Sequence, residues 1–454
     1  MKTILITIPN GAVSQGFLRT EFLPTLMQGG VRAVLVVPPY REAYYKKEFA
    51  GRANIVVEPA PMHRYKTFED LANRFLRQSI PSITIRNRQW HALYSHTGLK
   101  RFLTFAGTRA LWVMGHSCIW RQFLRFIYSL TPTAFMPLVD AYKPDLVFVT
   151  TSYDRMDLGL MKAARRRGVR TVGMTKSWDS ITSKCFFALW PDHLLVQNEL
   201  LKNEAAQYGD MGRERITVCG MPQFDFYYRE DMREARESTL ASVGLPAHAR
   251  YVLFGGEGLD LFPGECEVLD LVARGMQDDP ELSALTLVYR AHPNYEWCQG
   301  AGNHPNVVVD FPGKRIEDTA GGWEFEQDDV RHLVSTILHA EVLVTMASTL
   351  VLEAALFDRP AVGIATDGAV QKPFYLSAER YYHTDHYRAV VKTGALAVAR
   401  TPQAILDAIK KYLRNPAQDK EGRERLAKEQ TVFLDGKSAA RVADILLKEV
   451  GLSV

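Results

Sequence analysis

The chain has 454 residues, 47% of them hydrophobic and 23% charged, which is the composition of a globular protein of about two domains. A chain this long buries enough surface to fold without disulfides or a structural metal, which excludes a disordered, collagen-like or disulfide-dependent protein. The net charge of +4 is too small to indicate nucleic-acid binding. The five cysteines are scattered and lack a C-x-x-C pair, a pattern that suits a reducing compartment and argues against a cysteine zinc site.

The chain opens with the alternation typical of a parallel α/β sheet. Residues 4–8 form a continuous apolar run of β type, a Gly/Asn/Ser loop and a helix follow up to Leu26, and residues 33–37 form a second strand. This pattern predicts a right-handed βαβ unit within a doubly wound sheet. The short apolar run at the start does not have the form of a signal peptide, and the window 102–120 contains Arg109 and His116, so no transmembrane helix is expected.

Residues 61–130 interrupt this alternation. They hold eleven basic and two acidic residues, giving +9 there against −5 for the rest, with aromatic residues interleaved. We expect a basic, aromatic helical insert in the first domain. One interpretation is a surface for an anionic membrane or a lipid-diphosphate acceptor, with contacts from Trp120, Arg121 and Arg125. The other is a helical subdomain with an aromatic core and a solvated basic face.

The alternation resumes after the insert and repeats in the second half. Strands are predicted at 146–150, 170–174, 193–196, 216–218, 251–254, 285–289, 307–309, 342–344 and 361–364, and a helix at 158–167. The charged segment 225–236 predicts a linker helix, and 404–449 is helical by composition. The fold class is therefore α/β, with two Rossmann-like, doubly wound domains over 1–235 and 236–430.

Ligands of open α/β sheets bind where the strands end, so the loops after the strands of the second half are the candidate site. After the strand at 251–254 come Gly255, Gly256, Glu257 and Gly258, whose backbone N–H groups can approach an anion closely. The loop lacks both the dinucleotide and the P-loop fingerprints, and an ordinary tight turn remains the alternative.

Two further loops carry charged and hydroxyl side chains. Arg290 and His292 follow the strand at 285–289, and both can donate to a phosphate, the histidine also as a cation near neutral pH. After the strand at 342–344, Ser348 or Thr349 can cap a helix whose N-terminus attracts an anion. Glu353 lies within that apolar helix, where either a ribose diol or an ion pair with Arg359 would satisfy it. Together these residues describe a site for a nucleotide diphosphate, whereas Asp367-Gly368 is typical of a turn.

A series of motifs over about residues 145–450 resembles the GT-B glycosyltransferase superfamily, and within it the surface-polysaccharide branch that includes CDP-glycerol glycerophosphotransferases. The resemblance rests on Ser177-Trp178-Asp179-Ser180-Ile181-Thr182-Ser183-Lys184, Val218-Cys219-Gly220-Met221-Pro222-Gln223-Phe224-Asp225, Arg290-Ala291-His292-Pro293, Ser348-Thr349-Leu350-Val351-Leu352-Glu353-Ala354, His386-Tyr387 and Asp435-Gly436-Lys437-Ser438-Ala439-Ala440-Arg441. It implies two Rossmann-like domains facing a cleft, the acceptor on the first, the donor on the second, and a last helical segment, 431–454, that crosses back to the first domain.

The resemblance also implies roles for the residues of the second half. Arg290 and His292 would contact the donor phosphates, Ser348 and Thr349 would supply further donors, and Glu353 would hold the ribose. GT-B enzymes often need no metal, which fits the absence of D-x-D here, so neither a metal nor another cofactor is expected.

The expected activity is transfer of a sugar from a nucleotide-sugar donor to a surface-glycan or lipid-linked acceptor in cell-envelope polysaccharide biosynthesis. Charge on the leaving phosphate would be stabilised by Arg290, His292 and the helix N-terminus. Asp179 and Asp154 are the candidates for the base that takes the acceptor proton, although Asp179 can equally be a hydrogen-bond hub with Trp178 in the core.

Alternatives are a CDP-polyol phosphotransferase, a non-hydrolysing UDP-sugar 2-epimerase, or a protein that binds nucleic acid through its basic face, which a steep salt dependence would reveal. The expected location is cytoplasmic, with peripheral attachment to the inner face of the membrane left open.

Overall fold

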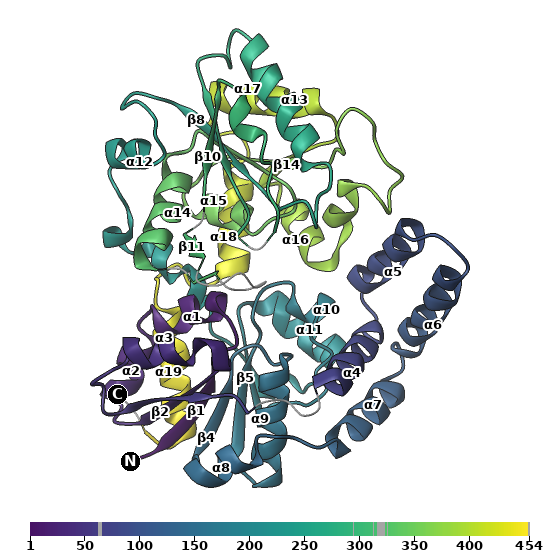
Figure 1. The fold of residues 1–454 in the computed structure, drawn as a ribbon, viewed down its shortest axis with the longest axis vertical. Coiled ribbons are helices and arrows are strands. Elements are labelled where there is room, and N and C mark those ends of the chain that lie inside the picture. Colours follow the sequence, from purple (N-terminus) through teal and green to yellow (C-terminus); the bar gives the residue numbers. More distant parts are fainter. Residues whose placement is uncertain (62–65, 294, 312, 316–322, 325, 453–454) are drawn as a thin grey trace. The chain divides into compact units, whose positions relative to one another are not determined.

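The computed structural model describes residues 1–61, 66–293, 295–311, 313–315, 323–324 and 326–452. The chain divides into two compact units. The first comprises Met1–Asp225 and Thr431–Val454, and the second comprises Phe226–Gln430. Each is an α/β layer structure built on its own parallel sheet (Figure 1).

The first unit contains a seven-stranded sheet in the order β3-β2-β1-β4-β5-β6-β7, with every neighbouring pair parallel. The order reverses between β1 and β4, as in a doubly wound fold. Its strands are β1 (Thr3–Thr7), β2 (Arg32–Val37), β3 (Ile55–Pro59), β4 (Leu146–Val149), β5 (Arg170–Met174), β6 (His193–Val196) and β7 (Ile216–Val218). The central strands are buried on both faces, which is why they appear in the sequence as uninterrupted apolar runs.

Helices cover both faces of this sheet. They are α1 (Gly11–Leu18), α2 (Phe22–Gln28), α3 (Glu42–Glu48), α8 (Met136–Tyr142), α9 (Arg155–Arg166), α10 (Ser180–Ser183), α11 (Glu199–Gly209) and α19 (Ser438–Glu449), with short 3₁₀ turns η1 (Pro39–Arg41) and η2 (Arg213–Arg215). Among the described residues, apolar clusters lie on both faces of the sheet, and a further cluster joins α10 and α11 to β6. α19 packs on α2 so closely that a Cβ atom on Gly29 would lie 2.4 Å from a methyl carbon of Leu447. The last helix is therefore part of the first unit's core.

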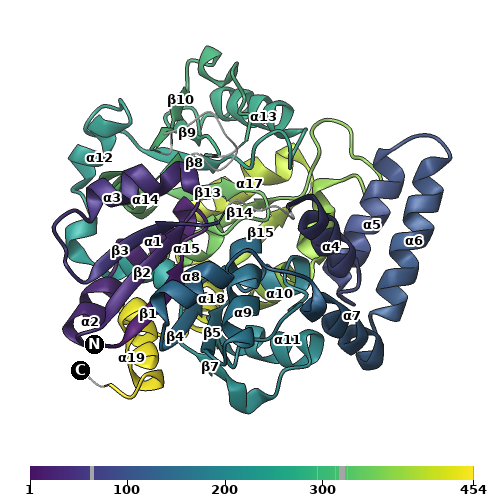
Figure 2. The same cartoon turned by 60° about the horizontal axis from the view of Figure 1, so that its bottom comes forward.

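In the described part of the segment between β3 and α8 lie four helices: α4 (Lys66–Gln78), α5 (Ile83–Ser95), α6 (Lys100–Met114) and α7 (Cys118–Leu130). α5 and α6 pack against each other, and all four gather at one side of the unit (Figures 1 and 2). Arg64, one of the eleven basic residues of the insert, lies outside the described residues. In the described part of the chain, no helix is long and apolar enough to span a bilayer.

The second unit contains a six-stranded parallel sheet in the order β10-β9-β8-β13-β14-β15, which again reverses after its first strand. Its strands are β8 (Tyr251–Gly255), β9 (Thr286–Arg290), β10 (Val307–Asp310), β13 (Val342–Thr345), β14 (Ala361–Ile364) and β15 (Leu396–Ala399); β11 (Lys314–Arg315) and β12 (Trp323–Glu324) form a separate antiparallel pair.

The helices of the second unit are α12 (Arg236–Ser242), α13 (Glu265–Asp278), α14 (Gln327–His339), α15 (Leu350–Leu356), α16 (Asp385–Thr393), α17 (Pro402–Arg414) and α18 (Lys420–Thr431), with 3₁₀ turns η5 (Ala301–Asn303) and η6 (Ala378–His383). The predicted α-helical linker over 225–236 is wrong. That stretch is covered by the 3₁₀ segments η3 (Pro222–Tyr228) and η4 (Glu230–Met232), and an α-helix begins only at Arg236. Asp225 explains the break, because its carboxylate accepts the backbone N–H groups of Ser438 and Ala439 at 3.0 and 2.8 Å.

Candidate functional site

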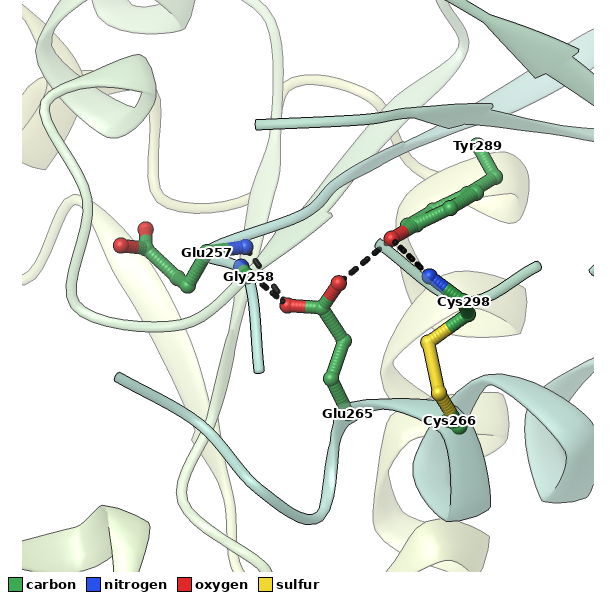
Figure 3. Close-up of a disulfide and its surroundings, with 6 residues drawn as sticks. All are labelled: Glu257, Gly258, Glu265, Cys266, Tyr289 and Cys298. Atoms are coloured by element: carbon green, nitrogen blue, oxygen red, sulfur yellow. Dashed lines mark hydrogen bonds between the residues drawn. A yellow bond between two sulfur atoms is a disulfide. The ribbon is translucent and has the colours of Figure 1, made fainter. Parts of the chain in front are cut away.

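The glycine-rich loop after β8 holds a carboxylate of the chain itself. The N–H groups of Glu257 and Gly258 donate to one Glu265 oxygen at 2.6 and 2.9 Å, and the Tyr289 hydroxyl donates to the other at 2.6 Å (Figure 3). The turn needs its glycines: Gly258 has a φ of +81°, and a Cβ atom on Gly256 would lie 2.9 Å from both Glu265 and Tyr289. The expectation that these amides meet an external anion is therefore corrected, because Glu265 already binds them.

The loop nevertheless presents one carboxyl group with an unpartnered oxygen. Glu257 is 9% exposed, and among the described residues its Oε1 atom has no hydrogen-bond partner. Burial raises the pKa of Glu257 to about 7; a hydrogen bond with Ser348 opposes the rise, and the nearby Glu265 adds to it. Near neutral pH this group can either donate or accept a proton.

Arg290 ends β9 and lies in a buried ion pair. Its guanidinium contacts Asp310, which is its register partner on β10, and the other Asp310 oxygen is 2.8 Å from His332 Nε2. Although burial opposes ionisation, Arg290 and His332 hold the pKa of Asp310 below its usual range. The positive charge of Arg290, which was expected to bind the donor phosphates, is thus partly neutralised by Asp310 within the protein. Asp310 was missed, although the register of adjacent parallel strands could have suggested it.

His292 lies two residues after Arg290, in the loop that follows β9, and is half-buried. Its ring stacks on Tyr295 with centroids 4.6 Å apart. Burial lowers the pKa of His292 to about 4, so the imidazole is neutral at physiological pH. The interpretation of His292 as a cation is corrected, although a neutral imidazole still offers one N–H donor.

The loop after β13 brings hydroxyl groups and a carboxyl group to the same end of the sheet. Thr349 stands at the N-cap of α15, but its side chain makes no capping bond, and Ser348 Oγ is 3.5 Å from the N–H of Leu350. Glu353 is buried and accepts hydrogen bonds from the Tyr227 hydroxyl and from Thr349. Burial raises the pKa of Glu353, and the charge of nearby Arg290 opposes the rise.

Glu353 forms no ion pair with Arg359 or with any other described residue, so that alternative is not observed. Its partner Tyr227 comes from η3, and the sequence offered no signal for this pairing beyond the aromatic run that contains it.

Glu257, Arg290, His292, Ser348, Thr349 and Glu353 therefore converge at the carboxyl ends of β8, β9 and β13, which are neighbours in the sheet. In the described part of the chain, no group of three or more metal-ligating side chains lies together.

A disulfide fixes the loop that follows β9. Cys266, in the first turn of α13, is bonded to Cys298, 32 residues later (Figure 3). The backbone N–H of Cys298 donates to the Tyr289 hydroxyl at 3.2 Å, which links this bond to the Glu265 cluster. The scattered cysteines gave no indication of the pair, and the inference of a reducing compartment drawn from them loses its basis.

The first unit has a pocket of about 420 Å³ after β4, lined by basic residues and one of the predicted carboxylates. Its lining includes Arg74, Arg77, Asp154, Arg155 and Lys184. Asp154 caps α9, accepting the N–H of Met156 at 2.9 Å. Asp157, which was not singled out, is fully buried and accepts the N–H groups of Thr151 and Ser152. Burial, with a smaller effect from Asp154, raises the pKa of Asp157 to about 6.

Asp179 occupies a hydrogen-bond hub beside this pocket. It contacts Ser177, Ser183 Oγ at 3.0 Å and Lys184 Nζ at 2.8 Å. Trp178 is buried. The structural alternative for Asp179 therefore has direct support.

The insert residues expected to meet an acceptor or a membrane lie inside the unit. Arg121 and Arg125 are buried, and both pair with Asp210. Arg125 also donates to the carbonyl of Phe187 at 3.0 Å. Trp120 is half-buried, with its indole N–H directed at Ser79 Oγ at 3.4 Å. The prediction that Arg121 and Arg125 form an exposed contact surface is wrong, because Asp210 binds both.

Two Rossmann-like parallel sheets, one in each unit, are the architecture of the GT-B class. Solved structures of this class align over nearly the whole chain. The UDP complex of MnaA from S. aureus has 13% identity and a TM-score of 0.56, covering 99% of this chain and 97% of that one. UDP-GlcNAc 2-epimerase from Neisseria meningitidis bound to UDP-GlcNAc has 10% identity and a TM-score of 0.55, covering 99% and 100%.

The glycotransferase of kitacinnamycin has 14% identity and a TM-score of 0.52, covering 98% of each chain. At these identities the likeness concerns the fold. No curated protein sequence matches the chain.

The comparison with protein families gives a narrower assignment than the fold does. The model of CDP-glycerol:poly(glycerophosphate) glycerophosphotransferase matches residues 175–448. The chain belongs to this family and is a transferase of GT-B architecture.

Proposed function

We propose that this enzyme transfers a polyol phosphate from a CDP-activated donor to an acceptor hydroxyl, and that the second unit binds the donor. The observation that carries the proposal is the family match over 175–448, which contains the whole strand-end cluster of the second unit. Transfer of a sugar from a nucleotide sugar, the activity first expected from the motifs, is the second candidate, and the two differ in the nucleotide released.

The donor's diphosphate would lie against the carboxyl ends of β8, β9 and β13. Arg290 supplies a guanidinium that Asp310 holds in place, and preorganised charge of this kind stabilises a leaving phosphate. His292 and the hydroxyl groups of Ser348 and Thr349 supply neutral hydrogen-bond donors. Glu353, already oriented by Tyr227, would accept a ribose hydroxyl. We propose that no metal is needed, so turnover in EDTA should equal that in buffer alone.

In the transfer step, the acceptor hydroxyl loses its proton, its oxygen forms a bond to the phosphorus of the polyol phosphate, and CMP leaves with the electrons of the broken P–O bond. Glu257 is the carboxyl group best suited to take the proton, since one of its oxygens is unpartnered and its pKa lies near neutrality. Asp154 and Asp179 remain weaker candidates, because a helix cap and a hydrogen-bond hub already use them.

The acceptor would bind to the first unit, in the pocket lined by Arg74, Arg77, Arg155 and Lys184. Asp70 and Asp154 line the same pocket, and Arg155 and Lys184 are paired with Asp70 and Asp179. Arg74 and Arg77 are therefore the side chains that would meet an anionic acceptor, such as a phosphorylated surface glycan or a lipid-linked glycan, at the inner face of the membrane.

Product analysis tests the reaction. The enzyme is incubated with CDP-glycerol or with UDP-GlcNAc, with and without a glycerol-phosphate oligomer, and the released nucleotides are separated. We expect acceptor-dependent CMP release. Acceptor-dependent UDP release would identify a sugar transferase instead, and conversion of UDP-GlcNAc without an acceptor would identify an epimerase.

Glu257→Gln tests the proton acceptor. The variant should keep its affinity for CDP within about twofold and lose at least about 100-fold in turnover, the usual contribution of a general base. Glu326→Gln, at the exposed N-cap of α14, is the matched control. Equal turnover in the Glu257 variant and the wild type would remove Glu257 from the reaction.

A further inference from the structure

The first unit has a second pocket, separate from the one after β4. It lies between α5 and α6, which pack side by side as a helical hairpin, and it has a volume of about 620 Å³ (Figure 2). Basic side chains (Arg88, Lys100 and Arg101) line it together with amide and apolar groups. We call it the hairpin pocket, and we call the pocket that contains Arg77 and Lys184 the β4 pocket.

The bases of the hairpin pocket have no acidic residue beside them. In the stretch 66–130 the acidic residues are Glu69, which is buried, and Asp70, and neither lines this pocket. Lys100 is exposed, and Arg101 donates to the carbonyl of His96 at 2.6 Å. Among the described residues, the buried Nε atom of Arg101 has no hydrogen-bond partner. The positive charge here is therefore not neutralised locally, and it attracts an anion.

The start of α6 adds to this positive potential. Lys100 and Arg101 are its first two residues, its first turn contains no acidic residue, and Leu99 at the N-cap makes no side-chain capping bond. Two cations at the N-terminus of a helix are unfavourable, because the helix dipole is positive there. An anion bound between the two side chains would remove this repulsion and would accept the free backbone N–H groups.

A buried amide in the wall of the pocket indicates a second feature of the ligand. Gln89 is 4% exposed, and its Nε2 atom donates to Gln78 Oε1 at 3.0 Å and to the carbonyl of Thr108 at 2.9 Å. Its Oε1 atom has no partner among the described residues, and a buried acceptor without a donor is costly. A hydroxyl group of a ligand would satisfy it. An anion that also carries hydroxyl groups has the chemistry of a sugar phosphate or polyol phosphate.

The hairpin pocket adjoins the β4 pocket, to which the acceptor is assigned. Arg77, in the last turn of α4, lines the β4 pocket, and the next residue, Gln78, lines the hairpin pocket. A second link lies at α10, where Arg88 donates to the carbonyl of Ser183 at 3.2 Å and the next residue, Lys184, lines the β4 pocket. A ligand that occupies both pockets would be a chain with repeated phosphate and hydroxyl groups.

We propose that the hairpin pocket is a second acceptor subsite, which holds a phosphate-bearing unit of the acceptor while the reacting end lies in the β4 pocket. Lys100 and Arg101 bind the phosphate, and Gln89 accepts a hydroxyl group. The inference rests on the proposed function, because it takes the acceptor to bind the first unit. Linked units that occupy both pockets bind more tightly than one unit alone. The enzyme should therefore favour acceptors long enough to reach the hairpin pocket.

Calorimetric titration of a soluble glycerol-phosphate oligomer into the full chain, without donor, tests the subsite. The wild type should bind the oligomer, and Lys100→Gln/Arg101→Gln should bind it at least about fivefold more weakly through the loss of two charges. Lys143→Gln/Arg213→Gln is the matched control, because it removes the same charge from exposed positions of the same unit outside the pocket. Its affinity should equal that of the wild type.

Ala92→Trp tests the pocket without changing the charge. Ala92 is exposed and lines the hairpin pocket, so an indole there can fill the pocket without entering the core. This variant should also lose at least about fivefold in affinity for the oligomer. The thermal midpoints of both pocket variants should match that of the wild type, which verifies that they fold.

Transfer assays with acceptors of different length give a readout that a merely structural role would not change. Lys100→Gln/Arg101→Gln should raise the KM for the oligomer several-fold more than the KM for glycerol 3-phosphate, which cannot reach both pockets. Absence of CMP release by the wild type with every acceptor would contradict the proposed function, whereas the calorimetric result would still decide whether the pocket binds the oligomer.

Three results would overturn the inference. The first is no binding of the oligomer to the wild type, or equal affinities in the wild type and Lys100→Gln/Arg101→Gln. The second is a loss in this variant without a loss in Ala92→Trp, because the oligomer would then be attracted by charge without entering the pocket. The third is binding to phosphatidylglycerol vesicles and not to the soluble oligomer, which would assign the pocket to a lipid headgroup.

Discussion

Arg121 and Arg125 were expected to bind a ligand or a membrane at the surface, but a single carboxylate gives them a structural role inside the protein. In the sequence they are two of many bases on an aromatic helix, but in the fold Asp210, at the end of α11, binds both. Burial opposes ionisation of Asp210, yet the two arginines hold its pKa below the usual value. The group therefore stabilises the fold at neutral pH, and this contribution is lost as the pH falls below about 4.

Arg125→Leu should lower the free energy of unfolding by about 3 kcal/mol, because it leaves a buried carboxylate with one partner fewer. Urea denaturation at neutral pH measures this. Arg74→Leu, at an exposed position, should change the stability by less than about 0.5 kcal/mol. A similarly small change for Arg125→Leu would mean that the ion pair does not fasten the insert.

Glu257 should make the stability fall as the pH rises. Its pKa is about 7 in the folded chain against an ordinary value of 4.5, so between these pH values the folded state keeps a proton that the unfolded state has released. The wild type should thus lose up to about 3 kcal/mol relative to Glu257→Gln between acidic and mildly alkaline pH. Unfolding free energies of the two proteins across this range give the difference directly; parallel curves would contradict the burial of an ionisable group there.

Among the elements, the loop after β9 depends on its disulfide. The bond closes a segment of 32 residues that contains β9 and His292. Cys266→Ser/Cys298→Ser, or reduction of the wild type, should lower the unfolding free energy by about 3 to 4 kcal/mol. Calorimetric melting with and without reductant measures the loss, and Cys118→Ser, at an exposed free cysteine, is the control. An unchanged melting temperature after complete reduction would show that the loop is held by its hydrogen bonds alone.

The strands were predictable and the connections between them were not. A strand buried in a parallel sheet is rich in apolar and β-branched residues, and β5, β6, β7 and β14 begin and end at the residues predicted for them. β3 ends in Glu58 and Pro59, and β15 is rich in alanine, so the sequence pattern did not predict either strand. The linker was misassigned because its charged residues suggested a helix, whereas Asp225 binds the distant start of α19.

At the scale of the whole molecule, the sequence predicted which side chains of the candidate site lie together, but not which of them already pair with other residues of the protein. Parallel topology brings the ends of β8, β9 and β13 together, and this alone gathers Glu257, Arg290 and Ser348. Which of these groups the protein already pairs depends on Asp310, Glu265 and Tyr227, whose positions follow from register and tertiary packing. The predicted phosphate site with two positively charged side chains, Arg290 and His292, therefore has one guanidinium, which is paired with Asp310, and several neutral hydrogen-bond donors.

The central claim is that the strand-end cluster of the second unit binds a nucleotide diphosphate donor. Calorimetric titration of CDP and UDP into the wild type, Glu353→Gln and the control Glu326→Gln tests it most directly. We predict that one nucleotide binds the wild type and the control alike, and that Glu353→Gln, which keeps the size of the side chain, weakens it at least about fivefold through the loss of a charged hydrogen-bond acceptor. Equal affinities in all three proteins, or no binding of either nucleotide, would contradict the account.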